Sequence, residues 1–204
     1  MDNGIKIQRE LVVNWHITEA CNYHCNYCFA KWDKQKNELM NDEDSVSKLM
    51  DEIQKLPSIL NGKYLTEFES IRLNLVGGET FLNIRKVTRI IHQAKQRKFS
   101  LSAITNGSRL NNELVTLIAN DFNSIGFSVD SLDSPTNIKI GRTEKSGVMD
   151  TDKVLKDISL IKELNPSIDI KINTVVSSLN QTEDLSAFID QAAPNKWKVF
   201  KVLP

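Results

Sequence analysis

Apolar and polar residues along this chain follow two periodicities in turn. Short apolar or alternating runs predict strands, and apolar residues three and four positions apart predict amphipathic helices between them. The expected strands cover residues 11–18, 71–76, 101–105, 125–129, 168–176 and 197–203. The expected helices cover residues 42–56, 83–97, 111–119, 152–164 and 182–192. Proline removes a helical hydrogen bond, so we expect the first helix to end at Pro57 and a loop to run through Pro135 and Gly141.

Regular alternation of strand and helix predicts an α/β fold with parallel strands and right-handed crossovers. This alternation fits an open doubly wound sheet or a partial barrel. A parallel strand that is buried on both faces should be almost entirely apolar, yet polar residues occupy alternate positions here. They are Asn14, His16 and Thr18 in the first strand, Arg72 and Asn74 in the second, Lys171 and Asn173 in the fifth, and Lys196 and Lys198 in the sixth. We therefore expect a partial (β/α)6 barrel over residues 11–204, preceded by an extension over residues 1–10.

Four of these alternating positions carry a cation. If the apolar faces of the strands lie under the helices, then Arg72, Lys171, Lys196 and Lys198 line a common interior. Unpaired charges in an interior are costly, so we expect an anionic phosphate or carboxylate ligand held by charge-assisted hydrogen bonds. The alternative is a sheet whose polar face lies in water.

Composition narrows the functional classes. The 204 residues are 40% hydrophobic, which suits one domain with a sizeable core. The formal net charge is zero, so no global field for a polyanion exists and direct nucleic-acid binding is not expected. No apolar run reaches the roughly 18 residues of a membrane span, and residues 1–10 are too polar for a secretory signal. We expect a cytoplasmic monomer without a membrane anchor.

All three cysteines, Cys21, Cys25 and Cys28, lie in one expected loop. An odd number of clustered thiols argues against a disulfide framework and for a metal. A zinc site would need a fourth ligand, for which His24 or His16 is the candidate. An iron–sulfur cluster held by three thiolates would instead leave one iron open for a substrate or cofactor. Both readings fit the spacing.

Other polar motifs follow the later strands. Gly77-Gly78-Glu79-Thr80 ends the second strand, Thr105-Asn106-Gly107-Ser108 the third, and Ser128 and Asp130 the fourth, while Arg142 lies in the following loop. The carboxyl ends of barrel strands converge on a ligand, and paired glycines let a backbone approach a ligand closely. Taken alone, the paired glycines and Thr105-Asn106-Gly107-Ser108 are more typical of plain turns, Asp130 could cap a turn with Ser131, and Arg142 could be an ordinary loop arginine.

The spacing C-x3-C-x2-C followed by Phe29 resembles the signature of the radical S-adenosylmethionine enzymes. Gly77-Gly78-Glu79 matches three of four positions of a motif that binds the methionine ammonium in that superfamily, with Thr80 in place of proline. Further strings resemble the viperin family, in its prokaryotic branch, from about residue 11 to the last residue. They are Asn14-Trp15-His16-Ile17-Thr18, Ala30-Lys31-Trp32, Asp130-Ser131-Leu132-Asp133, Asn137-Ile138-Lys139-Ile140-Gly141-Arg142, Lys171-Ile172-Asn173 and Trp197-Lys198-Val199-Phe200.

The resemblance implies a [4Fe–4S] cluster and S-adenosylmethionine as cofactors, with flavodoxin or ferredoxin as electron donor. It implies abstraction of the 4′ hydrogen of CTP, UTP or GTP and net dehydration to an antiviral 3′-deoxy-3′,4′-didehydro nucleotide. The cluster would be held by Cys21, Cys25 and Cys28. S-adenosylmethionine would be bound by Gly77, Gly78, Glu79, Asn106, Ser128 and Arg142. The nucleotide would be bound by Asn14, Arg72, Lys171, Asn173, Lys196 and Lys198.

The family continues beyond the position that corresponds to Pro204, with a region that helps to close the site. We therefore expect a C-terminal extension to be missing here. Three alternatives stay open: a radical enzyme acting on a peptide, a form that binds nucleotide without turnover, and a zinc-stabilised binding module.

Overall fold

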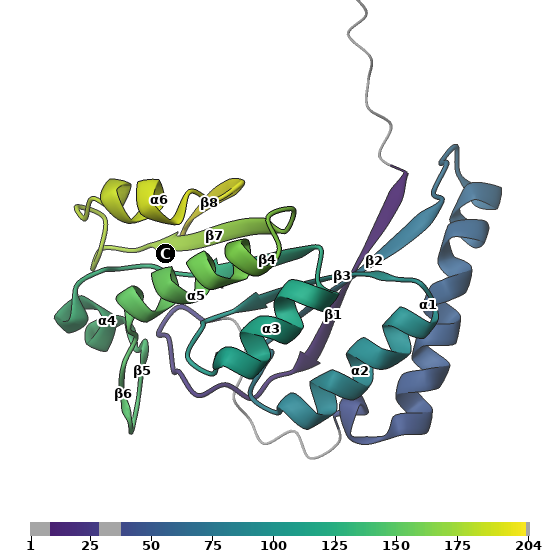
Figure 1. The fold of residues 1–204 in the computed structure, drawn as a ribbon, viewed down its shortest axis with the longest axis horizontal. Coiled ribbons are helices and arrows are strands. Elements are labelled where there is room, and N and C mark those ends of the chain that lie inside the picture. The colour runs from purple at the N-terminus through teal and green to yellow at the C-terminus, as the bar shows by residue number, and fades with distance from the viewer. Residues whose placement is uncertain (1–8, 29–37, 203–204) are drawn as a thin grey trace, which may run out of the picture.

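The computed structural model describes residues 9–28 and 38–202. Within these ranges six strands form one parallel sheet in the order β1-β2-β3-β4-β7-β8 (Figure 1). Their bounds are Glu10–Thr18 (β1), Ser70–Gly77 (β2), Ser100–Thr105 (β3), Ser124–Ser128 (β4), Asp169–Val176 (β7) and Lys196–Lys201 (β8). A separate antiparallel pair is formed by Thr143–Glu144 (β5) and Gly147–Val148 (β6).

The helices between the strands begin at side-chain caps. The helices are Glu43–Lys63 (α1), Ile84–Gln96 (α2), Asn112–Asp121 (α3), Ser134–Ile140 (α4), Thr151–Leu164 (α5) and Ser186–Ala192 (α6), with a 3-10 turn at Leu39–Asn41 (η1). In five helices an Asp or Asn before the first residue accepts a hydrogen bond from the third backbone N–H that follows it. These caps are Asp42, Asn83, Asn111, Asp133 and Asp150. Each cap satisfies one of the backbone donors that a helix leaves unpaired at its start.

The strand order decides between the two expected architectures. Each strand pairs with the next in the chain, apart from the small β5–β6 hairpin. A doubly wound sheet would instead reverse its strand order near the middle. Asn14 of β1 and Lys198 of β8, which lie on the two outermost strands, line the same cavity. The sheet therefore curves around an interior, and the predicted partial barrel is confirmed.

The apolar faces of the central strands lie under the helices, as the alternation predicted. Leu73, Ile125 and Ile170 are fully buried in a core shared with α2, α3 and α5. These helices and α1 cover one face of the sheet, and α3 packs against α5 (Figure 1). The polar face of the sheet is left to form the interior of the barrel. Trp197 and Val199 of β8 are exceptions, since both are exposed.

The expected end of the first helix at Pro57 is wrong. Helix α1 runs through Pro57 to Lys63. Proline costs the helix one hydrogen bond, but Asn61 secures the last turn: its side chain donates to Phe68 O at 2.9 Å and accepts from Thr66 Oγ1 at 2.9 Å. Contacts with the residues that follow the helix therefore support its end beyond the proline.

The expected loop through Pro135 and Gly141 is also wrong in part, since α4 and the β5–β6 hairpin occupy it. Helix α6 begins at Ser186 rather than residue 182, and β8 ends at Lys201. Of the expected extension over residues 1–10, residues 1–8 lie outside the described part, and β1 already begins at Glu10. Phe29, Ala30-Lys31-Trp32 and Leu203 also lie outside it.

Candidate functional site

The cysteine loop follows β1 and is held by the end of α4. Gly141 O accepts a hydrogen bond from His24 N at 3.0 Å, and Ile140 O accepts one from Asn26 N at 2.9 Å. The last carbonyls of a helix lack partners within it, so here the backbone on both sides of Cys25 supplies them. Gly141 has φ +93°, and a Cβ on it would lie 2.2 Å from His24 O. Only glycine fits this contact.

The three thiols are half-buried and free of disulfides. Burial raises the pKa of Cys21 to about 11 and also raises the pKa of Cys25. Among residues 9–28 and 38–202, no three His, Cys, Asp or Glu side chains gather around a position for a single metal ion. A [4Fe–4S] cluster places its cysteine ligands on different iron atoms, so they need not meet at one point. Three thiols that lie in one loop but do not converge on one point fit such a cluster better than a closed zinc site.

The Gly77-Gly78-Glu79 turn at the end of β2 is bonded to the start of the cysteine loop. Gly78 N donates to Thr18 O at 2.8 Å, and Glu79 N donates to Ala20 O at 2.9 Å. A Cβ on Gly78 would lie 2.2 Å from Ala20 O, so a side chain there would force the two segments apart. The close backbone approach predicted for this turn is therefore made to the chain itself. A further role of the turn toward a cofactor stays a prediction.

Glu79 is fully buried beside Cys21. Its carboxylate accepts hydrogen bonds from Thr105 Oγ1 at 2.6 Å, Asn106 N at 2.8 Å and Phe81 N at 3.1 Å. Burial raises the pKa of Glu79, and these hydrogen bonds oppose the rise. The Asn106 side chain donates to Cys21 Sγ at 3.8 Å. Two residues predicted to bind S-adenosylmethionine, Glu79 and Asn106, thus lie together at the first cysteine.

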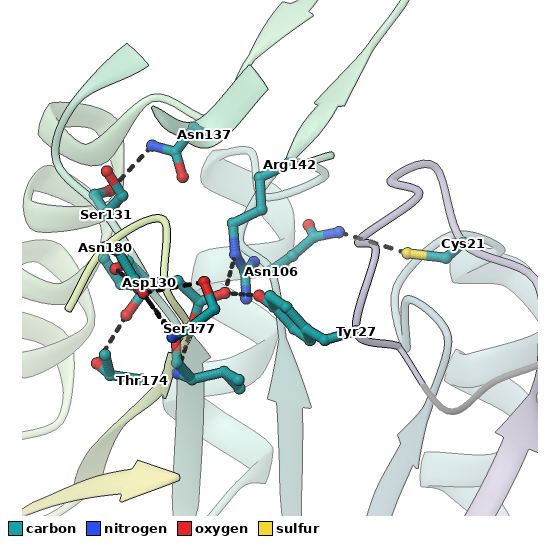
Figure 2. A network of polar contacts seen from close by, with 12 residues as sticks. Cys21, Tyr27, Asn106, Asp130, Ser131, Asn137, Arg142, Thr174, Ser177 and Asn180 are labelled. Atoms are coloured by element: carbon teal, nitrogen blue, oxygen red, sulfur yellow. Dashed lines mark hydrogen bonds and ion pairs between the residues drawn. The ribbon is translucent and has the colours of Figure 1, made fainter. Parts of the chain in front are cut away.

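Asp130 and Arg142 form a buried ion pair on the other side of the loop (Figure 2). Asp130 also accepts a hydrogen bond from the Tyr27 hydroxyl and one from Val175 N at 2.7 Å. Arg142, predicted to bind S-adenosylmethionine, therefore already has a carboxylate partner in the chain. Ser128, at the carboxyl end of β4, is half-buried and lies opposite Asn173 in the strand register.

A cavity of about 240 Å³ lies on the polar face of the sheet. Its lining includes five of the six residues predicted to bind the nucleotide: Asn14, Arg72, Lys171, Asn173 and Lys198. Lys196 is exposed and lies opposite Lys171 in the β7–β8 register, beside the cavity rather than in its lining. Gly126 of β4, opposite Lys171 on the other side, adds no side chain to this wall.

The cations of this cavity are poorly compensated. Arg72 Nη1 lies 3.4 Å from Glu10 Oε2, while Arg72 Nε is buried without a hydrogen-bond partner. Lys171, Lys196 and Lys198 make no ion pair with any residue in the described ranges. Burial and then the neighbouring Arg72 lower the pKa of Lys171. An anion with several charged oxygens would satisfy these groups.

Three features of the site were missed by sequence reasoning. Asp133 before Pro135 and Gly141 at the far end are a helix start and stop, and they could have revealed α4. The contacts of Tyr27 with Asp130 and of Thr80 Oγ1 with Ile104 O at 2.7 Å join residues distant in sequence, which leave no local signal. Thr80, which stands where the superfamily motif has proline, is buried and bonded to the end of β3.

Comparison with protein families matches residues 15–190 to the radical SAM superfamily. Two solved structures illustrate the fold. Streptococcus suis SuiB bound to S-adenosylmethionine aligns with a TM-score of 0.68 at 17% identity, over 97% of this chain and 41% of SuiB. Native anSMEcpe with bound AdoMet aligns with a TM-score of 0.62 at 18% identity, over 95% of this chain and 52% of that one. Fold and cysteine loop are therefore those of a radical SAM domain.

Among curated proteins, the chain is 62% identical to an S-adenosylmethionine-dependent nucleotide dehydratase of Psychrobacter lutiphocae, over 100% of this chain and 69% of that protein. Proteins of the same name from Fibrobacter sp. and Pseudoalteromonas ulvae are 38% and 36% identical, each over 96% of this chain and over 56% and 65% of their own lengths. The chain belongs to this family of S-adenosylmethionine-dependent nucleotide dehydratases, and it spans about two thirds of the length of these relatives or less. The family predicted from the sequence is confirmed.

No helix among residues 9–28 and 38–202 combines the length and the apolar character that crossing a bilayer requires.

Proposed function

We propose that this chain carries the radical domain of a nucleotide dehydratase that acts on a nucleoside triphosphate. The reaction implied by the family resemblance begins with abstraction of the 4′ hydrogen. The nucleotide loses one water overall, made up of that hydrogen and the 3′ hydroxyl, and becomes a 3′-deoxy-3′,4′-didehydro nucleotide with antiviral activity. The cofactors are a [4Fe–4S] cluster and S-adenosylmethionine, which together supply a 5′-deoxyadenosyl radical. The superfamily match and the curated relatives support this assignment.

The chain's own residues have separable tasks in this proposal. Cys21, Cys25 and Cys28 hold the cluster, and the end of α4 orients their loop through His24 N and Asn26 N. The second set, at the ends of β2, β3 and β4 and just after α4, faces S-adenosylmethionine. This set is Gly77, Gly78, Glu79, Asn106, Ser128 and Arg142.

The observation that favours a triphosphate substrate is the excess of positive charge at the cavity, where four cations face the carboxylates of Glu10 and Asp169. Arg72 and Lys171 line it, Lys196 and Lys198 lie beside or in it, and a buried donor of Arg72 has no partner. Asn14 and Asn173, in the same lining, offer amides for hydroxyl or phosphate oxygens. A peptide substrate would not require four cations at one site.

The deciding experiment is anaerobic reconstitution of the cluster, followed by incubation with S-adenosylmethionine, dithionite and CTP, UTP or GTP in separate reactions. Mass spectrometry would quantify 5′-deoxyadenosine and a nucleotide lighter by one water. We expect both products in step with one nucleotide, and loss of the dehydrated product in Lys171→Ala. Equal 5′-deoxyadenosine in every reaction, without a dehydrated nucleotide, would contradict the substrate assignment and reopen the peptide alternative. Nucleotide binding without either product would select the form that binds without turnover.

Three further assignments belong to this proposal. A flavodoxin or ferredoxin would supply the electron, because the cluster needs a one-electron donor of low potential. The protein would act as a monomer. We place it in the cytoplasm, because thiols that must hold a cluster have to stay reduced.

A further inference from the structure

Asp130 is a buried carboxylate at the carboxyl end of β4 that neither the cluster nor the nucleotide assignment uses. Its side chain is fully buried, and its two oxygens contact groups from three different segments (Figure 2). Oδ2 accepts hydrogen bonds from the Tyr27 hydroxyl and Arg142 Nε, and Oδ1 accepts one from Val175 N at 2.7 Å. The carboxylate is thus fully used by the chain.

On one side Asp130 contacts the cysteine loop. Tyr27 lies between Cys25 and Cys28, so its hydroxyl fixes the half of the loop that carries these two thiols. Arg142 directly follows Gly141, whose carbonyl accepts from His24 N. In Figure 2, Tyr27 and Arg142 point toward Asp130 from different sides. The cysteine loop and the segment Gly141-Arg142, which is hydrogen-bonded to that loop, therefore both contact the carboxylate of Asp130.

On the other side Asp130 accepts its bond from Val175 N of β7, two residues beyond Asn173, and the preceding residue Val129 bonds to Asn173 itself. Val129 N donates to Asn173 O at 2.9 Å, and Thr174 Oγ1 donates to Val129 O at 2.7 Å. Asn173 lines the cavity. The Asn180 side chain adds a hydrogen bond of 2.7 Å to Asp130 O. Hydrogen bonds therefore join the ends of β4 and β7 at Asp130, the residue that also bonds to Tyr27 of the cysteine loop.

The charges of this network act on the cysteine loop as well. Arg142 and Asp130 carry opposite charges as one buried ion pair, and Asp130 also bonds to the hydroxyl of Tyr27, which lies between Cys25 and Cys28. Removal of either member would leave an unbalanced charge close to the cysteine loop. Net charge near an iron–sulfur cluster is one of the determinants of its reduction potential.

We propose that Asp130 is a positioning residue that holds the cysteine loop in register with the nucleotide cavity, through Tyr27 and Arg142 on one side and the ends of β4 and β7 on the other. This inference rests on the proposed function for its substrate, but not for its cluster. Hydrogen-bonded groups behind the direct ligands orient metal sites in general, and here one carboxylate would serve two sites.

The first test is the midpoint potential of the reconstituted cluster, without S-adenosylmethionine or nucleotide, followed by electron paramagnetic resonance. Reduction adds an electron, so a nearby positive charge favours it. We expect Arg142→Gln to lower the potential and Asp130→Asn to raise it. The double variant should return toward the wild-type value, and Arg142→Lys should stay near it. Potentials that do not change, or that change in the same direction in both single variants, overturn the electrostatic link.

The second test uses Tyr27→Phe, which keeps the ring and removes only the hydroxyl bonded to Asp130. We expect normal iron content but a several-fold higher ratio of 5′-deoxyadenosine to dehydrated nucleotide, since the loop would be less well aligned with the cavity. Tyr64→Phe, at an exposed tyrosine that ends α1, is the matched control. An unchanged ratio in Tyr27→Phe overturns the alignment role.

The two tests separate this inference from the proposed function. If the wild-type chain dehydrates no nucleotide, the proposed function fails, while the potentials of the Arg142 and Asp130 variants still decide whether the network acts on the cluster. If Asp130→Asn does not fold, the inference is decided by the lower potential expected of Arg142→Gln against Arg142→Lys, together with the product ratio of Tyr27→Phe.

Discussion

The two polar regions of the barrel differ in how their charges are satisfied. Around the cysteine loop, the buried carboxylates of Glu79 and Asp130 each accept three hydrogen bonds from the chain, and Arg142 pairs with Asp130. In the cavity, Arg72 keeps an unpartnered buried donor, and Lys171 lies near Arg72, Lys196 and Lys198, with Asp169 as a nearby carboxylate. The buried charges are therefore better matched by partners in the chain around the cysteine loop than in the cavity.

This difference indicates what each set of residues does. Removal of one partner from a buried charge is costly, because the charge left behind is uncompensated. A buried charge whose bonds are made within the chain also has little capacity left for a new ligand. Cations brought together without counter-charges destabilise the free protein, and an anion relieves that cost on binding. The cavity is therefore the better candidate for direct contact with phosphate. Glu79 and Arg142 also support the segments around the cysteine loop, in addition to the role toward S-adenosylmethionine proposed above.

The largest effect should come from Cys25→Ala. Two thiolates rarely retain a cubane cluster, so we expect complete loss of bound iron and of the brown colour. Nucleotide binding at the cavity should persist, because no cavity residue belongs to the loop. Iron analysis and calorimetric titration with a nucleoside triphosphate measure the two sites in one preparation. Loss of nucleotide binding as well would show that the two regions are not separable in this way.

The next effect concerns the cavity alone. Lys171→Ala removes a cation from a site that should hold phosphate, and loss of a charge-assisted hydrogen bond predicts an affinity about 10- to 100-fold weaker. S-adenosylmethionine binding and iron content should hardly change. Lys156→Ala, at an exposed lysine of α5, is the matched control. Equal weakening of both ligands in Lys171→Ala would contradict the assignment of this cavity to the nucleotide.

A smaller effect tests the region that is satisfied internally. Thr105→Val keeps the shape of the side chain but removes the hydroxyl that donates to Glu79 at 2.6 Å. Loss of a hydrogen bond to a buried carboxylate predicts a free energy of unfolding lower by about 2 kcal/mol. Denaturant titration of the ligand-free protein measures it. Thr116→Val is the control, because Thr116 is exposed and its hydroxyl donates to a backbone carbonyl within helix α3. If both variants lower the free energy of unfolding by a similar amount, the hydrogen bond from Thr105 to Glu79 contributes no more than an ordinary exposed hydroxyl bond.

The sequence predicted the fold better than it predicted the contacts within the site. Strand alternation in β2 and β7 correctly placed Arg72 and Lys171 on the interior face, because side chains of a strand point to opposite faces in turn. Helix α1 was predicted too short, since propensity alone cannot register the bonds of Asn61 with residues beyond the helix. Lys196 was placed in the interior by the same alternation, but β8 is an edge strand that is exposed on both faces.

The support of the cysteine loop could not be predicted from the sequence. Asp130 is 103 positions from Tyr27 in the chain, and a contact of that separation depends on the packing of the complete barrel. The motif around Asp130 was recognised, but its local pattern fits a turn equally well. Residues that belong to a local sequence motif could therefore be predicted. The role of a residue that acts through partners distant in the sequence could be recognised only from the structure.

The smallest predicted effect is a dependence on pH that has opposite signs for binding and stability. Burial and Arg72 lower the pKa of Lys171 in the folded chain, so the unfolded chain binds more protons between that value and the ordinary one. The free energy of unfolding of the ligand-free protein should therefore gain a small increment as pH rises through this window. Over the same window Lys171 loses its proton and nucleotide affinity should fall a few-fold.

The phosphate itself titrates near pH 6, so above about pH 8 its charge stays constant. Titrations from about pH 8 to 10 measure both quantities, and Lys171→Arg, which keeps its charge throughout, should abolish both slopes. If the pH dependence of unfolding free energy and of nucleotide affinity persists in Lys171→Arg, another group titrates. If both are lost, Lys171 is the group whose charge binds the nucleotide.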